Sequence, residues 1–320
     1  MQLEQSGDFI NSSDMPAWIN ANEVMNNFGK YYLIDIRSSQ DFLNGHIEGS
    51  INILPANLIN HLKSINSNEY EKIVLISSTG EESAFCTGLL RFLNYDNVYS
   101  LKWGIAVWNI DFADIWFDKQ DERRYYYHMQ DFRGWQISKF DDVFPIDKDG
   151  YFSLPFNNNT NLESRIQELL SEGFSNASFT FDEMMSDYVP DPEPNPWYNH
   201  PYKFNHTFVI CYGPEIFYWA PVDGYIALGH PFTAVRFRPY QSLKPLTDLQ
   251  VIPPSKIVGV YCITGQESPF VVAYLRILGY NAKSVRFGGQ AIYYKNLHYY
   301  PWFESLEPDS VKNFNYVTGP

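Results

Sequence analysis

One cysteine in this chain stands where a protein can keep a reactive thiolate. Cys262 follows the apolar segment 257–261, which predicts a buried strand, and precedes the apolar segment 269–278, which predicts a helix ended by Gly279. In open α/β sheets, chemistry is placed where a parallel strand ends beneath a helix N-terminus. Backbone N–H groups and the helix dipole favour a thiolate there. The sequence therefore predicts that Cys262 is a catalytic nucleophile.

The loop after the cysteine supplies groups that could hold a charged sulfur. Thr264 and Ser268 offer hydroxyl donors, and Gly265 permits the tight curl that would turn the loop amides inward. Ser268 is also the expected N-cap of the helix, with Pro269 as its first residue. The complete predicted active-site loop is Ile263, Thr264, Gly265, Gln266, Glu267 and Ser268.

Glu267 is the residue of this loop that works against a thiolate. A carboxylate about 6 Å from the sulfur would raise the thiol pKa by roughly two units, which is more than a helix dipole offsets. We therefore expect Glu267 either to point away from the sulfur or to be neutralised by a cation. By position in the sequence, the candidate cations are Arg236, Arg238 and Arg286.

The same strand, loop and helix occur earlier in the chain. The loop Ser77–Ser83 shares the pattern Thr-Gly-x-Glu-Ser with the loop 262–268, at an offset of 185 residues (262 − 77). Three further pairs of segments repeat: Gly45-His46 with Gly229-His230, Trp103-Gly104 with Gly288-Gly289, and the predicted capping boxes Asn20-x-x-Glu23 and Thr180-x-x-Glu183. We therefore expect two related α/β units, with Ser77 in the place of Cys262.

These segments, in this order, resemble the rhodanese domain of sulfurtransferases. The first copy carries Asp35-Ile36-Arg37, Gly45-His46-Ile47-Glu48-Gly49-Ser50 and Gly104-Ile105, and the second carries the cysteine loop with looser versions of the rest. Tandem members of this family commonly keep an inert first domain, and this chain is similar to them. The resemblance implies an α/β fold of two rhodanese-like domains, each a parallel sheet flanked by helices, with a long structured connector. Asp35, Arg37 and His46 are expected to form a buried cluster that braces the first domain.

The resemblance also implies a function. It indicates a sulfurtransferase that moves a sulfane sulfur through a Cys262 persulfide to a thiophilic acceptor, and it leaves the thiosulfate and 3-mercaptopyruvate types open. The substrates would be a small sulfur donor and a thiol or cyanide-like acceptor, with no metal or organic cofactor. His230, Arg236 and Arg286 are candidate substrate-binding residues. The first domain would be inactive, because Ser77 cannot form a persulfide.

A second class of function stays open, a non-catalytic rhodanese-like binding or sulfur-carrier module. Acidic residues in both loops favour the module, whereas the retained cysteine favours the enzyme. A phosphatase is disfavoured because Ser268 stands where related folds keep the arginine that binds phosphate. A nucleophilic role for Ser77 is disfavoured because its loop offers only Glu81 and Glu82 as general bases.

The repeat sets the expected domain boundaries. They are a flexible tail over 1–15, a first domain over 16–112, a connector over 113–174 and a second domain over 175–320. The connector is too long to be bare, and residues 161–170 within it predict an amphipathic helix. The proline-rich stretch 190–196 cannot form a helix or a central strand. This stretch and the connector are the candidate surfaces for a protein partner, and the aromatic segment 293–303 is expected to pack on the second domain.

Composition excludes several classes of function. The net charge of −14 argues against binding to nucleic acid or anionic membranes, and no segment approaches the roughly 18 apolar residues that span a bilayer. Three cysteines are too few for a disulfide framework or a zinc site, and Cys86 and Cys211 are expected to be buried structural thiols. The compartment is undetermined: an Asn- and Tyr-rich composition slightly favours an exported bacterial protein if a signal was removed, and otherwise a cytoplasmic one.

Overall fold

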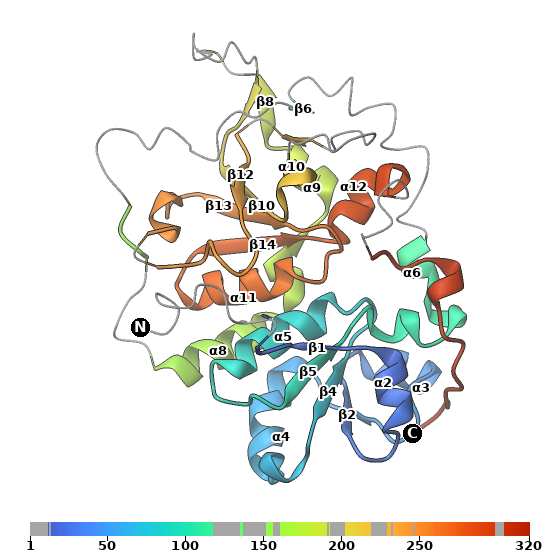
Figure 1. The fold of residues 1–320 in the computed structure, drawn as a ribbon. Helices are drawn as coiled ribbons and strands as arrows, with labels where there is room; N and C mark the ends of the chain where they lie inside the picture. The colour runs from blue at the N-terminus through green and yellow to red at the C-terminus, as the bar shows by residue number, and fades with distance from the viewer. Residues whose placement is uncertain are drawn as a thin grey trace.

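Two five-stranded parallel sheets organise the chain (Figure 1). The computed structural model describes residues 12, 14–117, 135–136, 152–155, 161–190, 192, 202–218, 229–231, 233–245, 247–297 and 304–320. The strands of the first sheet are β1 (Trp18–Ile19), β2 (Tyr32–Asp35), β3 (Ile51–Asn52), β4 (Ile73–Ile76) and β5 (Val98–Leu101). Those of the second are β7 (Ser178–Phe179), β10 (Thr207–Tyr212), β12 (Val235–Phe237), β13 (Ile257–Tyr261) and β14 (Asn281–Val285). We call each sheet with its helices the first unit and the second unit.

The two sheets have the same topology. The strand order is β1-β5-β4-β2-β3 in the first and, read from the opposite edge, β7-β14-β13-β10-β12 in the second. All neighbouring strands within both sheets are parallel. The central strands are therefore β4 and β13, and the loops 77–83 and 262–268 leave the middle of their sheets. This confirms the expected α/β fold with two parallel sheets.

Helices cover both faces of the sheets and fill the space between them. In chain order they are α2 (Ala21–Asn26), α3 (Ser39–Asn44), α4 (Leu58–Ser64), α5 (Glu81–Arg91), α6 (Asp114–Phe117), α8 (Leu162–Glu172), α9 (Phe181–Met185), α10 (Glu215–Tyr218), α11 (Ser268–Ile277) and α12 (Gly288–Leu297). Two short antiparallel pairs add to them: β6 (Trp135–Gln136) with β11 (His230–Pro231), and β8 (Tyr188–Pro190) with β9 (Tyr202–Phe204).

Local sequence signals account for some of the helix starts. The predicted capping box at Thr180 begins α9, and Asn161 caps α8 by accepting from the amides of Glu163 and Ser164. The capping box predicted at Asn20 is wrong, because its side chain makes no capping hydrogen bond. Glu23, its expected partner, instead forms an ion pair with Lys72. The ion pair with a residue distant in the sequence has replaced the expected local capping contact.

The two units share one hydrophobic core, and α5 and α11 form its centre. These helices lie side by side between the sheets (Figure 1). Gly88 of α5 allows the close approach, because a Cβ there would lie 3.1 Å from the Cβ of Ala273. The rings of Phe92 and Tyr274 stack 5.7 Å apart across the same contact. The core cluster accordingly contains residues from both sheets.

The segment expected to connect the two domains carries structure of its own. The predicted helix at 161–170 is α8, and it buries Ile166, Leu169 and Leu170 in the shared core. Farther upstream, β6 pairs with β11 of the second unit. Residues 118–134, 137–151 and 156–160 of this connector lie outside the described part of the chain, as do 1–11 of the expected tail and 191 and 193–196 of the proline-rich stretch.

The last described segment, residues 304–320, packs on the first unit rather than the second (Figure 1). The backbone of Val317 pairs with that of His46 in both directions, at 2.9 Å each. The Trp108 indole donates to the carbonyl of Asn315 at 2.8 Å. The expectation of a second domain running unbroken to residue 320 is therefore wrong at its end. The predicted packing of the aromatic segment 293–303 depends on side chains that lie outside the described part of the structure.

No helix in the described part of the chain is both long enough and apolar enough to cross a membrane.

Candidate active site around Cys262

Residues 262–268, here called the Cys262 cradle, wrap the thiol in donors. The amide of Ser268 donates to Cys262 Sγ at 3.3 Å, and the thiol in turn donates to Ser268 Oγ at 3.4 Å. Ser268 Oγ also lies 2.9 Å from Ser284 Oγ at the end of β14. Helix α11 begins at Ser268, so its N-cap is Glu267, one residue before the predicted cap. The sulfur lies under the helix N-terminus, as predicted.

Residues 77–83, here called the Ser77 cradle, repeat this arrangement with an oxygen in place of the sulfur. The amide of Ser83 donates to Ser77 Oγ at 3.2 Å, and the Ser77 and Ser83 hydroxyls lie 3.0 Å apart. Ser83 Oγ then lies 2.8 Å from Ser100 Oγ at β5. The trios Ser77–Ser83–Ser100 and Cys262–Ser268–Ser284 are thus equivalent in place and in hydrogen bonding.

Burial sets the charge state of Cys262. Its side chain is 0 % exposed, and this loss of solvation raises the pKa of the thiol above its usual value. The Glu267 carboxylate raises this pKa further, while the Ser268 hydroxyl and the amides of Ser268 and Glu267 lower it. The expectation of a depressed thiol pKa is therefore wrong. The donors are present, but desolvation outweighs them.

The two cradles hold each other through a reciprocal pair of contacts. Glu81 Oε1 of the first accepts from the amide of Phe287 at 2.6 Å, and Gln266 Oε1 of the second accepts from the amide of Trp103 at 2.9 Å. Gln266 also donates from Nε2 to the carbonyl of Thr79 at 3.0 Å. Glu81 and Gln266 occupy matching positions, 185 residues apart (266 − 81). The Ser77 cradle therefore contacts the turn after β14, and the Cys262 cradle contacts the turn after β5.

The turns that receive these contacts have an uncommon backbone. Trp103 has φ 67° and Phe287 has φ 63°, and each precedes a glycine that also has a positive φ. Residues with side chains rarely adopt this conformation, and it costs of order 1–3 kcal/mol. The cross-unit hydrogen bonds to both amides help to hold it. The sequence repeat matched Glu81 with Gln266, but it paired Trp103 with Gly288, whereas the structure makes Phe287 the equivalent of Trp103. It also gave no sign that these residues meet.

Comparison with known proteins identifies the first unit. Residues 20–111 match the family model described as the rhodanese-like domain. Residues 20–111 are thus similar to a rhodanese-like domain. It is 29% identical over 77 residues to the uncharacterised protein YibN of Escherichia coli K12, a match that covers 24% of this chain and 54% of that protein. The chain thus spans about half the length of the curated relatives it matches.

Solved structures extend the comparison. A rhodanese-related protein from Thermoplasma volcanium is 28% identical over 28% of this chain and 85% of its own, with a TM-score of 0.25. A probable thiosulfate sulfurtransferase is 16% identical over 85% of this chain and 96% of its own, with a TM-score of 0.30. The likeness to the rhodanese-like domain rests on the match over residues 20–111.

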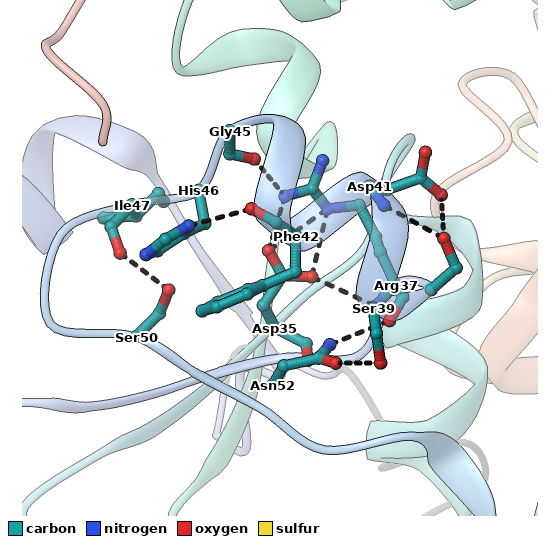
Figure 2. A network of polar contacts seen from close by, with 11 residues as sticks. Asp35, Arg37, Ser39, Asp41, Phe42, Gly45, His46, Ile47, Ser50 and Asn52 are labelled. Carbon is teal, nitrogen blue, oxygen red and sulfur yellow. Dashed lines mark hydrogen bonds and ion pairs between the residues drawn. The ribbon is translucent and has the colours of Figure 1, made fainter. Parts of the chain in front are cut away.

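Figure 2 shows the buried cluster that was predicted to brace the rhodanese-like unit. Arg37 and Asp35 form an ion pair at 2.6 Å, and Arg37 Nη2 donates to the carbonyl of Gly45 at 2.7 Å. His46 takes a separate place, with its Nδ1 2.8 Å from the carbonyl of Phe42 and its ring stacked on the Phe42 ring at 3.7 Å. The cluster ties the end of β2 to the Gly-His segment.

The candidate substrate-binding residues of the second unit lie in three different settings. His230 stacks on Tyr218 with ring centroids 3.6 Å apart, and its Nδ1 lies 2.7 Å from the Tyr218 carbonyl, which repeats the arrangement of His46. Arg236 donates from Nε to the carbonyl of Gly213 at 3.2 Å. Arg286 lies over the Phe287 ring at 5.2 Å, and its charge lowers the pKa of Glu81 in the Ser77 cradle.

Glu81 combines burial with a shifted pKa. Desolvation raises the pKa of its carboxyl to about 7, against the opposing effects of Arg286, the Phe287 amide and the Thr79 hydroxyl, which donates to Oε2 at 3.0 Å. Glu267 differs in being partly exposed, and it accepts a hydrogen bond from the Tyr240 hydroxyl at 3.2 Å. The carboxyl of this site whose pKa lies near neutral pH thus belongs to the unit that lacks the cysteine.

The other two cysteines are buried and free, as predicted. Burial raises the pKa of Cys211 to about 12 and that of Cys86 well above its usual value. Cys211 is the register partner of Tyr261, so it faces the opposite side of the sheet from Cys262. Within the described residues, no three His, Cys, Asp or Glu side chains are grouped so that they could hold a metal ion.

Proposed function

We propose that this protein is a sulfurtransferase that carries a sulfane sulfur as a persulfide of Cys262. One observation carries the proposal: Cys262 occupies, in the second sheet, the place that Ser77 occupies in the rhodanese-like unit, with matching hydrogen bonds. The equal strand order of the two sheets supports a second rhodanese-like domain in the part of the chain after residue 175. In this proposal the first unit is inactive, because a serine hydroxyl cannot carry sulfane sulfur.

The proposed reaction has two displacement steps. The Cys262 thiolate attacks the sulfur to be transferred. In thiosulfate the S–S bond breaks and its electron pair leaves on sulfite, whereas in 3-mercaptopyruvate the C–S bond breaks and its electron pair leaves on the enolate of pyruvate. The amides of Glu267 and Ser268 and the Ser268 hydroxyl would stabilise the persulfide anion. A thiol or cyanide-like acceptor then attacks the outer sulfur, and the Cys262 thiolate leaves.

Burial of the thiol places one requirement on this chemistry. A donor cannot reach a sulfur that is 0 % exposed, so the loops around the Cys262 cradle must separate before the first step. Opening would also solvate the sulfur and remove the main cause of its raised pKa. The described arrangement is thus the closed form of the proposed enzyme.

The test is cyanolysis with thiosulfate and with 3-mercaptopyruvate as donors. We expect turnover with at least one of them, and a mass gain of about 32 Da after incubation with the donor that cyanide removes. The matched variant is Cys262→Ser, because the Ser77 cradle accommodates a hydroxyl among the same donors. This variant should keep its fold and lose turnover to background. Turnover that survives in Cys262→Ser would refute the proposed persulfide.

A non-catalytic rhodanese-like module, for binding or for carrying sulfur, is the second candidate. The sealed cradle and the Glu267 carboxylate, which raises the thiol pKa, favour it. Its partner surface would be the connector or the proline-rich stretch that follows β8. Silence with both donors, together with no mass gain on Cys262, would support this candidate over the enzyme.

A further inference from the structure

The carboxyl of Glu81 reaches from the first unit into the second and is 0 % exposed. It accepts from the Phe287 amide at 2.6 Å through Oε1 and from the Thr79 hydroxyl at 3.0 Å through Oε2. The helix that carries it, α5, is packed against α11, so Glu81 is fixed at both ends. This side chain therefore ties the position of the Phe287 turn to that of the first unit.

The turn held by Glu81 is also a wall of the Cys262 cradle. The amide of Gly289 donates to the carbonyl of Cys262 at 2.8 Å. A Cβ added to Gly288 would lie 2.5 Å from that carbonyl and 2.3 Å from the amide of Gly265. Turn and cradle are in such close contact that one cannot move without the other. A displacement of Phe287 would loosen the backbone around the sulfur.

We propose that Glu81 is a positioning residue for Cys262: its carboxyl holds the Phe287–Gly288 turn against the cradle and so controls access to the thiol. The inference rests on the proposed role of Cys262 and adds to it a task for the unit that lacks the nucleophile. In this proposal the first unit keeps the Cys262 cradle closed. Gln266 makes the converse contact with Trp103, but its amide does not titrate.

The groups around Glu81 give this contact a pH dependence. The positive charge of Arg286, the residue after β14, lowers the pKa of Glu81. Glu82 follows Glu81 on α5, and the neutral Gln266 comes from the opposite loop. Burial raises the pKa of Glu81 from 4.5 to about 7, so the closed form binds the proton more tightly than a solvated carboxyl does. The stabilisation that protonated Glu81 gives the closed form is therefore fully present below about pH 4.5. It is lost as the pH rises through about 7.

The experiment measures how fast 4,4′-dithiodipyridine modifies Cys262 in the full chain at pH 5 and pH 8. The variants are Glu81→Gln, which keeps the acceptor but cannot ionise, and Glu81→Ala, which removes the acceptor. We expect Glu81→Gln to match the wild type at pH 5 and to react about 10- to 100-fold more slowly at pH 8. Glu81→Ala should react faster than the wild type at both pH values.

Cys86 is the internal control, because it is buried on the same helix as Glu81. Its modification rate, read from peptide masses in the same samples, reports loosening of the first unit as a whole. A ratio of Glu81→Gln to wild type that is the same at both pH values would overturn the proposal. Equal acceleration of Cys86 and Cys262 in Glu81→Ala would do so too. The assay needs no sulfur donor, so it fails or succeeds independently of cyanolysis.

Discussion

The Ser77 and Cys262 cradles are built alike and differ in where they keep their ionisable groups. Both hold a side-chain heteroatom by an amide and a hydroxyl six residues on. The cysteine belongs to the second cradle, whereas the buried carboxyl with a pKa of about 7 belongs to the first, opposite a neutral Gln266. The hydrogen-bond frame alone therefore does not decide which copy can react. The cysteine and the buried carboxyl are thus divided between the two units.

A second contrast lies at β2 and β10, the strands next to the central strands β4 and β13 of their sheets. Asp35 of β2 forms a buried ion pair with Arg37, whereas the matching residue of β10 is the uncharged Cys211. Both occupy the same register next to the following edge strand, opposite Asn52 and Arg236 respectively. The first unit thus depends on charge pairing at a position where the second depends on apolar packing.

The largest change in stability should come from breaking that ion pair. Asp35→Asn leaves the guanidinium of the buried Arg37 without its countercharge. We expect a loss of about 3–5 kcal/mol in the free energy of unfolding by urea. The matched change in the other unit, Cys211→Ala, removes one buried sulfur and should cost less than about 2 kcal/mol. Equal losses at the two positions would erase the contrast.

A carboxyl in the second cradle would test whether it matters that only one of the two reciprocal contacts between the cradles is made by an acid. Gln266→Glu puts a second buried acid beside the Trp103 turn, where Lys102, the counterpart of Arg286, is already paired with Glu304. Burial would raise the pKa of the new carboxyl, so stability should fall as the pH rises above about 4.5. We expect a loss of about 2–3 kcal/mol at pH 8 and a smaller loss at pH 5, by urea unfolding. A loss of the same size at both values would show that shape, not charge, is responsible.

The contact between the units can be sharpened at one glycine. Gly88→Leu forces a side chain against Ala273 and Phe270 of α11, and overpacking of this kind costs about 1–3 kcal/mol. Gly88→Ala is the control, since its Cβ needs only a small shift and gains about 1 kcal/mol in helix propensity. Thermal unfolding should separate the two variants clearly. If they unfold together, the α5–α11 contact is looser than described.

The fold was largely predictable because it depends on local signals that occur twice. The apolar segment at 257–261 is β13 to the residue, and α11 begins one residue before its predicted start. The matching loops at 77–83 and 262–268 predicted two similar sheets. These features follow from hydrophobic periodicity, glycine placement and helix capping, each of which acts over a few residues.

The chemistry of the site was less predictable because it depends on contacts between the units. Nothing within residues 262–268 indicates that the loop is covered, and the raised pKa of Cys262 follows from that cover. Glu81 and Gln266 were visible as matching positions, but their partners, Phe287 and Trp103, lie more than 160 residues away in the chain. Arg286 was a candidate cation for the thiol because it is near in sequence, yet its charge lowers the pKa of Glu81.

The return of residues 304–320 to the first unit has a consequence for synthesis. Asn315, which receives the Trp108 indole, is translated 207 residues after it. A nascent first unit must therefore wait, with one side uncovered, while the ribosome makes everything between. A chaperone or an early contact with the growing second half has time to act in this interval, and a nascent chain halted before residue 304 would expose the same apolar surface.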